Sequence, residues 1–191
     1  MDMLDKLINE TKNAIVAAVK GSDDVLSALR AAIKNQVIGT LTDVSNISTT
    51  GMDSVAAIVK GGVRSTTEIG TSIVDGARVS VRAAILGVSE VGGDVIMATG
   101  RATSEAVTTA AELGKDIGGV AVGAVEGAIK AAGSIGVSTT EAVEASVTGA
   151  IKAADSAGSE AGSSVRKALL SASSLPKDVV EKAIKGSPKG K

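Results

Sequence analysis

Two short motifs in this chain carry residue types that could do chemistry. Ser174 and Lys177 have the S-x-x-K spacing of acyl enzymes in which a lysine assists a serine nucleophile. Glu112 and Asp116 lie four residues apart, so on a helix both carboxylates would share one face and could hold a hard cation. No companion motif accompanies the serine, which stands where a helix N-cap is typical, and two carboxylates are too few for a dedicated site. We therefore predict no catalytic and no metal-binding residue.

The composition removes most other chemistry. The 191 residues include no His, Cys, Trp, Tyr or Phe, so imidazole bases, thiolate nucleophiles, zinc and haem ligation and disulfides are excluded. Without aromatic rings there is no stacking platform for single strands, and 20 Lys and Arg against 21 Asp and Glu leave no polyanion-binding footprint. We expect a protein that is not an enzyme and has no cofactor, no nucleic-acid partner and no small-molecule substrate.

A repeat of 22 residues organises most of the chain. Residues 127–132 and 149–154 both read Gly-Ala-Ile-Lys-Ala-Ala, and steps of 22 residues divide residues 17–170 into seven units without a slip in register. Apolar residues dominate three columns of the alignment. The third position holds Val19, Leu41, Val63, Ile85, Val107, Ile129 and Ile151; the seventeenth holds Ile33, Val55, Ala77, Thr99, Ala121, Val143 and Val165; the twenty-first holds Val37, Val59, Val81, Thr103, Val125, Val147 and Leu169.

The spacing of these columns is helical. Apolar positions recur every three or four residues and close after six turns in 22 residues, which is about 3.67 residues per turn. The sequence predicts an all-α protein of long amphipathic helices, packed in an oligomer or filament. Proline is absent before Pro176, so an extended rod is possible, whereas glycine pairs such as Gly92-Gly93 could admit turns and give a helical hairpin stack. Both arrangements stay open at this point.

We expect three parts along the chain. Residues 1–16 form an N-terminal lead-in helix, which a cap signal around Gly21 separates from the rest of the chain. Residues 17–170 are the seven helical repeats. Residues 171–191 contain a short helix over 177–185, which comes after the break at Pro176, and then a loose basic tail.

Glycine recurs in register, and we interpret these glycines as helix-packing residues. Small residues on one face allow a second helix backbone to approach closely. The tenth position is glycine in five successive repeats, and a further run has four-residue spacing. The candidate packing residues are Gly70, Gly92, Gly114, Gly136 and Gly158 from the column, and Gly119, Gly123 and Gly127 from the run.

Charged residues also keep to columns. The eighth position carries Asp24, Glu68, Glu90 and Glu112, and the fourth carries Lys20, Arg64, Lys130 and Lys152. One interpretation is a solvated helix face. The other is that basic columns meet acidic columns of a neighbouring copy and fix the register of an assembly.

In period and amphipathicity, residues 17–170 resemble the helical repeats of exchangeable apolipoproteins and synuclein-like proteins and, more loosely, of bacterial granule-coating phasins. They also look like uncharacterised bacterial Gly/Ala-rich amphipathic repeat proteins. The first resemblance implies a coat protein on a lipid or polymer-granule surface. Interfacial helices usually anchor through aromatic side chains, which this chain lacks, so we favour a non-enzymatic structural protein. It would self-assemble through its Gly/Ala/Val helical face into a filament, sheath or scaffold.

Two other expectations concern a third function class and the location of the protein. A threonine-rich ice-surface or stress protein is the third hypothesis, but Thr49, Thr50 and Thr71 do not hold their columns along the array. Residues 1–6 carry acidic side chains, no apolar signal segment comes after them, and charge-free stretches of about ten residues are too short to span a membrane. We expect a cytoplasmic protein whose main partner is itself.

Overall fold

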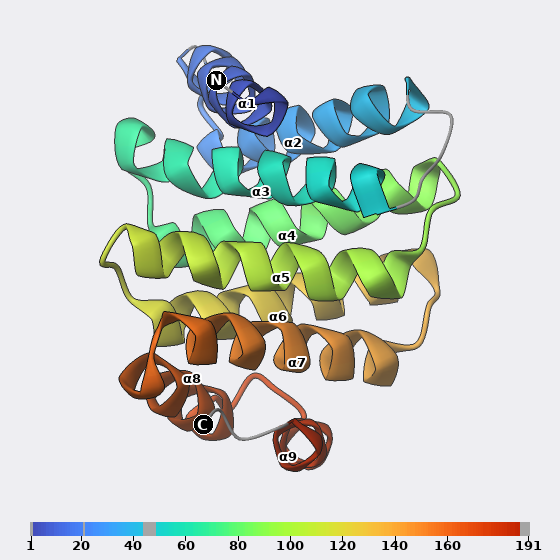
Figure 1. Ribbon diagram of the computed structural model, residues 1–191. Helices are drawn as coiled ribbons and strands as arrows, with labels where there is room; N and C mark the ends of the chain where they lie inside the picture. Colours follow the sequence, from blue (N-terminus) through green and yellow to red (C-terminus); the bar gives the residue numbers. More distant parts are fainter. Residues whose placement is uncertain (1, 21, 44–48, 188–191) are drawn as a thin grey trace.

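The computed structural model describes residues 2–20, 22–43 and 49–187, and it is a stack of helices (Figure 1). Within these ranges the chain forms nine helices and no strand, which confirms the all-α prediction. The expected break at Gly21 and the tail from residue 188 onward lie outside the described residues. The helices are α1 (Met3–Val19), α2 (Val25–Thr42), α3 (Thr49–Ile69), α4 (Ile73–Glu90), α5 (Val95–Glu112), α6 (Ile117–Ile135), α7 (Thr139–Ala157), α8 (Ser159–Ser171) and α9 (Lys177–Gly186).

In the middle of the chain, one repeat forms one helix and one tight turn. Helices α4 to α7 begin at residues 73, 95, 117 and 139, which are 22 residues apart. Each start has a side-chain cap: for example, Asp116 accepts a hydrogen bond of 2.8 Å from the backbone N–H of Gly119. Each end has a glycine with positive φ, as at Gly114 with φ +62°. The chain therefore reverses at every repeat and is not a single rod.

The helices lie in two layers. Every extensive contact joins helices that are one or two places apart in the chain. The odd-numbered helices α3, α5 and α7 form the front layer in Figure 1, and α4 and α6 lie behind them. Neighbours within a layer run parallel, because two reversals separate them. The result is a bundle-like stack in which each helix contacts only nearby repeats, as in other repeat proteins.

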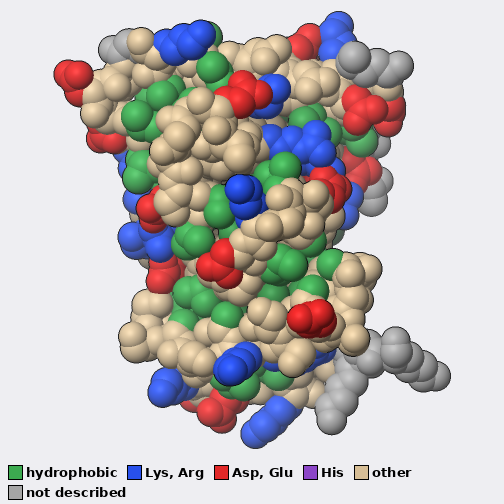
Figure 2. All heavy atoms as spheres, turned by 90° about the vertical axis from the view of Figure 1, so that its left-hand side faces the viewer, with side chains coloured by type: hydrophobic (Ala, Val, Ile, Leu, Met, Phe, Trp, Pro, Cys, Tyr) green, Lys and Arg blue, Asp and Glu red, His purple; other side chains and the backbone are tan. Residues whose placement is uncertain are grey.

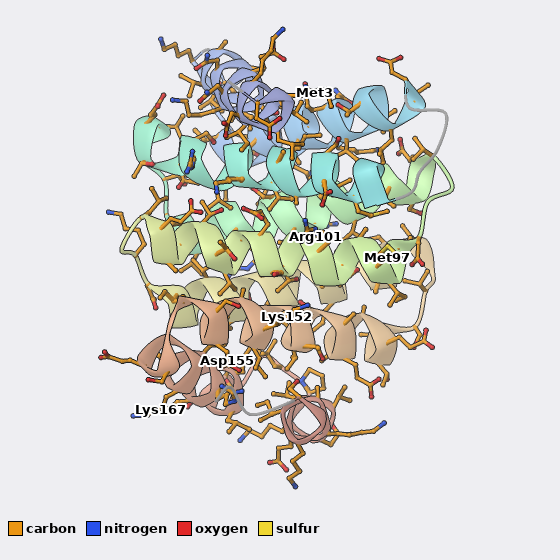
Figure 3. The ribbon with its side chains drawn as sticks, in the orientation of Figure 1. Met3, Met97, Arg101, Lys152, Asp155 and Lys167 are labelled. Atoms are coloured by element: carbon orange, nitrogen blue, oxygen red, sulfur yellow. The ribbon has the colours of Figure 1, made fainter. Side chains whose placement is uncertain are left out.

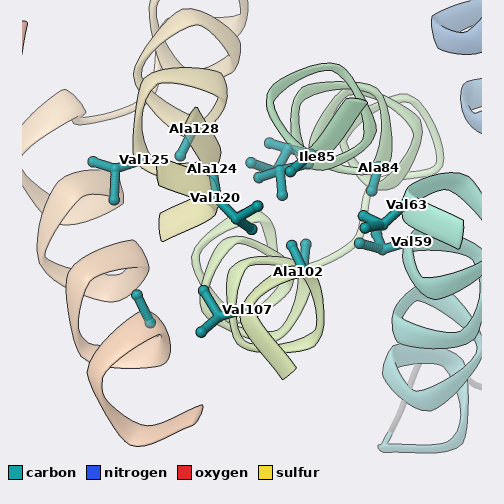
Figure 4. Close-up of a cluster of buried hydrophobic side chains, with 14 of the residues drawn as sticks. Val59, Val63, Ala84, Ile85, Ala102, Val107, Val120, Ala124, Val125 and Ala128 are labelled. Atoms are coloured by element: carbon teal, nitrogen blue, oxygen red, sulfur yellow. The ribbon is translucent and has the colours of Figure 1, made fainter. Parts of the chain in front are cut away.

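The core lies between the layers and is built from the apolar columns. Residues at the seventeenth and twenty-first positions are at most 1% exposed in all seven repeats. Figure 4 shows part of this core, in which Val59 of α3, Ile85 of α4 and Val120 of α6 belong to one cluster of buried side chains. Burying each valine, isoleucine or leucine side chain of this core contributes about 1.5–3 kcal/mol of hydrophobic free energy. The apolar stripe of each helix is therefore covered by other helices of the same chain.

The two ends of the stack differ from the repeats. Helix α1 extends to Val19, past the boundary expected at residue 16. Helix α9 occupies the segment in which a short helix is expected, and it buries Val180 and Ala183. Its other side chains, such as Lys177 and Glu181, are exposed or only half-buried. A terminal helix with a polar outer face is the usual cap of a repeat array.

Candidate functional site

The glycines proposed for helix packing fall into two structural groups. The five glycines of the tenth column lie at helix C-termini with φ of 70° (Gly70), 73° (Gly92), 62° (Gly114), 74° (Gly136) and 143° (Gly158). No heavy atom lies within 4 Å of the place where a Cβ would stand at any of the five. Their structural role is conformational, because side chains disfavour positive φ. The structure does not bring them into a helix interface.

The run of Gly119, Gly123 and Gly127 lies on α6 where it packs against α4. A Cβ at Gly127 would stand 2.3 Å from the backbone oxygen of Arg78, and one at Gly123 would stand 2.8 Å from that of Val74. At Gly119 it would lie 3.1 Å from a methyl group of Val74, although still closer to Asp116 of the same helix. These glycines permit the backbones of two helices in the same layer to touch.

The residues that could have done chemistry have structural partners. The Ser174 hydroxyl donates a hydrogen bond of 2.6 Å to the Glu126 carboxylate. Glu112 accepts from Lys60 at 2.8 Å and from Arg64 at 3.0 Å, and Asp116 caps α6. Among the described residues, no cluster of three or more potential metal-ligating side chains is found.

Ion pairs connect helices two places apart within each layer. In the eighth column Glu68 pairs with Lys12 at 2.6 Å and Glu90 pairs with Lys34. Several partners are separated by 48 residues, including Arg64 with Glu112 and Arg78 with Glu126. These three column glutamates therefore have partners in their own chain. Figure 2 shows basic and acidic side chains intermixed over the face formed by one set of helix ends.

Burial and charge shift two carboxyl groups of the α3–α5 network in opposite directions. Burial raises the pKa of Glu105 above its usual value, and the positive charge of Lys60, 3.6 Å away, offsets this only in part. Burial also acts to raise the pKa of Glu112, but hydrogen bonds and charge from Lys60 and Arg64 together outweigh it and lower that pKa. Lys60 thus interacts with two carboxylates, and its interaction with the more exposed Glu112 is the stronger.

A groove of about 640 Å³ lies on the surface between α5 and α7. Its sides carry small residues of both helices, including Gly100 and Ser104 of α5 and Ala145 of α7. The two backbones approach closely here, since a Cβ at Gly149 would lie 2.4 Å from the backbone oxygen of Gly100. Met97, which is 53% exposed, lies at the edge of the groove. Figure 3 shows Met97 and Arg101 along α5 and Lys152 on the neighbouring α7.

Four charged side chains line this groove, and two of them have no ion pair among the described residues. Arg101 pairs with Asp53, and Glu144 pairs with Lys182 at 3.0 Å. Glu141 and Lys152 are exposed and have no such partner. They are 11 residues apart, which is three turns or about 16 Å along α7, so they share one face of the helix.

Sequence reasoning did not find this groove, because it is formed by residues two repeats apart. Only the 11-residue spacing of Glu141 and Lys152 was visible as a signal in one helix.

No protein-family model matches the chain, and no curated protein sequence matches it significantly. Of the helices in the described part of the chain, none combines the length and the apolar character that crossing a bilayer requires.

Proposed function

We propose that this protein is a non-enzymatic structural scaffold whose copies associate through the groove between α5 and α7. The observation that carries the proposal is the pair of unpartnered opposite charges, Glu141 and Lys152, at the two ends of one exposed small-residue surface. As the sequence predicts, the proposed contact is made by small residues. It lies on the outer face of the odd-numbered layer, because the apolar stripe of the helices is buried within the chain.

The charges suit a second copy of the same chain. In an interface with twofold symmetry, residue i of one copy contacts residue j of the other, and the reverse contact is required by the symmetry. Two α7 helices laid antiparallel would place Glu141 of one copy beside Lys152 of the other, twice per interface. The small residues would permit close approach of the two helices, and Met97 would lose exposed apolar surface.

A coat on a lipid or polymer surface remains the alternative function. It would require the stack to open, because the apolar columns that would contact lipid are between the two layers. Association of folded chains requires no such rearrangement. The geometry therefore favours the scaffold.

Sedimentation velocity with interference optics tests the proposal, since the chain has no aromatic chromophore. We expect the wild type to self-associate with rising concentration, and Glu141→Lys or Lys152→Glu to weaken this by about tenfold, because each reversal replaces two attractive contacts by two repulsive ones. The double exchange Glu141→Lys with Lys152→Glu should restore association. Reversal of Glu160 and Lys167 on α8, outside the groove, is the matched control.

Three results would contradict the scaffold proposal. The first is a wild type that stays monomeric up to about 0.2 mM, a concentration at which even contacts worth about 5 kcal/mol would be visible. The second is association that is indifferent to the reversals at Glu141 and Lys152. The third is binding of the wild type to phosphatidylcholine vesicles with a change in helicity, which would favour the coat.

A further inference from the structure

A second hollow, of about 320 Å³, lies on the even-numbered layer, and its lining is unusually basic. Helix α2 contributes Arg30, α4 contributes Arg78 and Arg82, and α6 contributes Lys130. The one carboxylate in the lining is Asp24, which caps α2 by accepting a hydrogen bond of 3.0 Å from the backbone N–H of Ser27. Leu26 and Val79 supply apolar wall. We call this hollow the basic pocket.

The cations of the basic pocket are not equivalent. Arg78 is neutralised, since it pairs with Asp75 and donates from Nε to Glu126 at 2.6 Å. Burial acts to raise the pKa of Glu126, but hydrogen bonds from Ser174 and Arg78, together with the positive charges of Arg78 and Lys130, outweigh it and lower that pKa. Arg30, Arg82 and Lys130 have no ion pair within the described ranges, although Arg30 lies near Asp24 and Lys130 near Glu126.

Arg82 is the least satisfied of the three. Its side chain is half-buried, and its Nε is enclosed by protein without any hydrogen-bond partner. A buried donor without an acceptor is unfavourable, and more so when it belongs to a charged group. The environment of the Arg82 guanidinium is also electrostatically unfavourable, because Lys130, which has the same charge, lines the same hollow.

This arrangement of like charges differs from two ion pairs elsewhere in the stack. Residues 48 positions apart meet across a layer as opposite charges at Arg64 and Glu112, and at Arg78 and Glu126. The same separation relates Arg82 to Lys130 and Arg30 to Arg78, and these four residues, which line the basic pocket together, are all basic. Like charges side by side oppose folding, so the stack gains nothing from them. An anion in the pocket would supply the negative charge that these basic side chains lack.

We propose that the basic pocket binds a phosphate group, with Arg82, Arg30 and Lys130 as its ligands. Guanidinium groups offer paired N–H donors that match phosphate oxygens, and they bind phosphate more tightly than they bind neutral acceptors. The pocket volume lies at the small end of ligand sites, which suits inorganic phosphate or a small phosphate monoester. The inference is independent of self-association, because the pocket and the α5–α7 groove lie on different layers.

Isothermal titration with inorganic phosphate and with glycerol phosphate, against sodium chloride at matched ionic strength, tests the pocket. We expect saturable one-site binding of both probes, weakened at least about tenfold in Arg30→Gln with Arg82→Gln. The matched control, Lys115→Gln with Lys167→Gln, loses the same charge at exposed lysines outside the pocket and should bind as the wild type does. Circular dichroism checks that each variant is folded, and Arg30→Gln alone changes only an exposed side chain if the double variant does not fold.

The source of the phosphate is decided by a second probe. Vesicles with phosphatidic acid, compared with phosphatidylcholine alone, present the same group on a lipid. Vesicle binding that is lost with Arg30 and Arg82 would support the pocket and identify a lipid headgroup as its ligand. Absence of saturable binding to every phosphate probe overturns the proposal, as does binding that survives the loss of both arginines.

Discussion

The close contact between α4 and α6 predicts opposite effects for two glycine substitutions on the same helix. A Cβ added at Gly127 would stand 2.3 Å from the backbone oxygen of Arg78, whereas ordinary contacts begin at 3.4 Å. The two backbones would therefore have to separate by about 1 Å along a seam that also includes Gly123. At Gly133, a Cβ would have no heavy atom within 4 Å.

The magnitudes come from two effects. Overpacking of a well-packed contact costs about 1–3 kcal/mol, and a backbone–backbone clash belongs at the upper end because no side chain can rotate away. Alanine gains about 1 kcal/mol over glycine in a helix. We therefore expect Gly127→Ala to lower the free energy of unfolding by about 2 kcal/mol and Gly133→Ala to raise it by up to about 1 kcal/mol.

Urea denaturation followed by circular dichroism at the helix band measures both variants. With an m-value of about 2 kcal/mol per molar urea, the midpoint of Gly127→Ala should fall by about 1 M, and that of Gly133→Ala should rise. A midpoint for Gly127→Ala at or above that of the wild type would refute the reasoning. It would mean that α4 and α6 do not approach closely in solution.

The remaining predictions concern the turns and the buried carboxyl group. Gly114→Ala should destabilise the protein by about 1–2 kcal/mol in the same urea assay, because φ is +62° there and no steric contact is involved. Glu105→Gln should stabilise the protein at pH 7, since the raised pKa means that ionisation of Glu105 opposes folding above its ordinary value of 4.5. That gain should vanish below about pH 4, where the carboxyl is protonated in both states. Glu112→Gln, at a carboxyl with a lowered pKa, should instead destabilise at pH 7, and the same sign for both substitutions would contradict the assignment.

The buried surface of each helix could be predicted from the sequence. The seventeenth and twenty-first columns are four residues apart, and the third column of the next repeat comes after another four, so they form one stripe on a helix. The structure buries the first two columns completely. A 3.67-residue period is the same in a rod and in a stack of helices, however, so the stripe does not say whether its partner is another chain or the next helix.

The turns had a local signal of a different kind. Glycine at the tenth position is followed two residues later by an N-cap residue, as at Gly92 with Asp94 and Gly136 with Ser138. This combination marks a helix end and the next helix start. The regular spacing of these glycines does not by itself distinguish turns from a packing surface, because it is expected for both. Glu90 and Asp94, which on one continuous helix would be a like-charged pair one turn apart, lie on either side of a turn, at the end of α4 and before α5.

The surface sites had no comparable signal, because the structural period is two repeats. Successive helices alternate between the layers, so several charged side chains on the outer faces pair with residues of the helix two places along the chain, 48 to 56 residues away, and not with the adjacent repeat. Aligning adjacent repeats therefore compares residues that lie on opposite faces of the molecule. The residues that are neighbours in space lie two repeats apart. At a separation of 48 residues, Arg64 and Arg78 each pair with a carboxylate, whereas Arg82 and Lys130, which line the basic pocket, are both basic. Where the chain places like charges together, as in the basic pocket, a bound anion would supply the opposite charge.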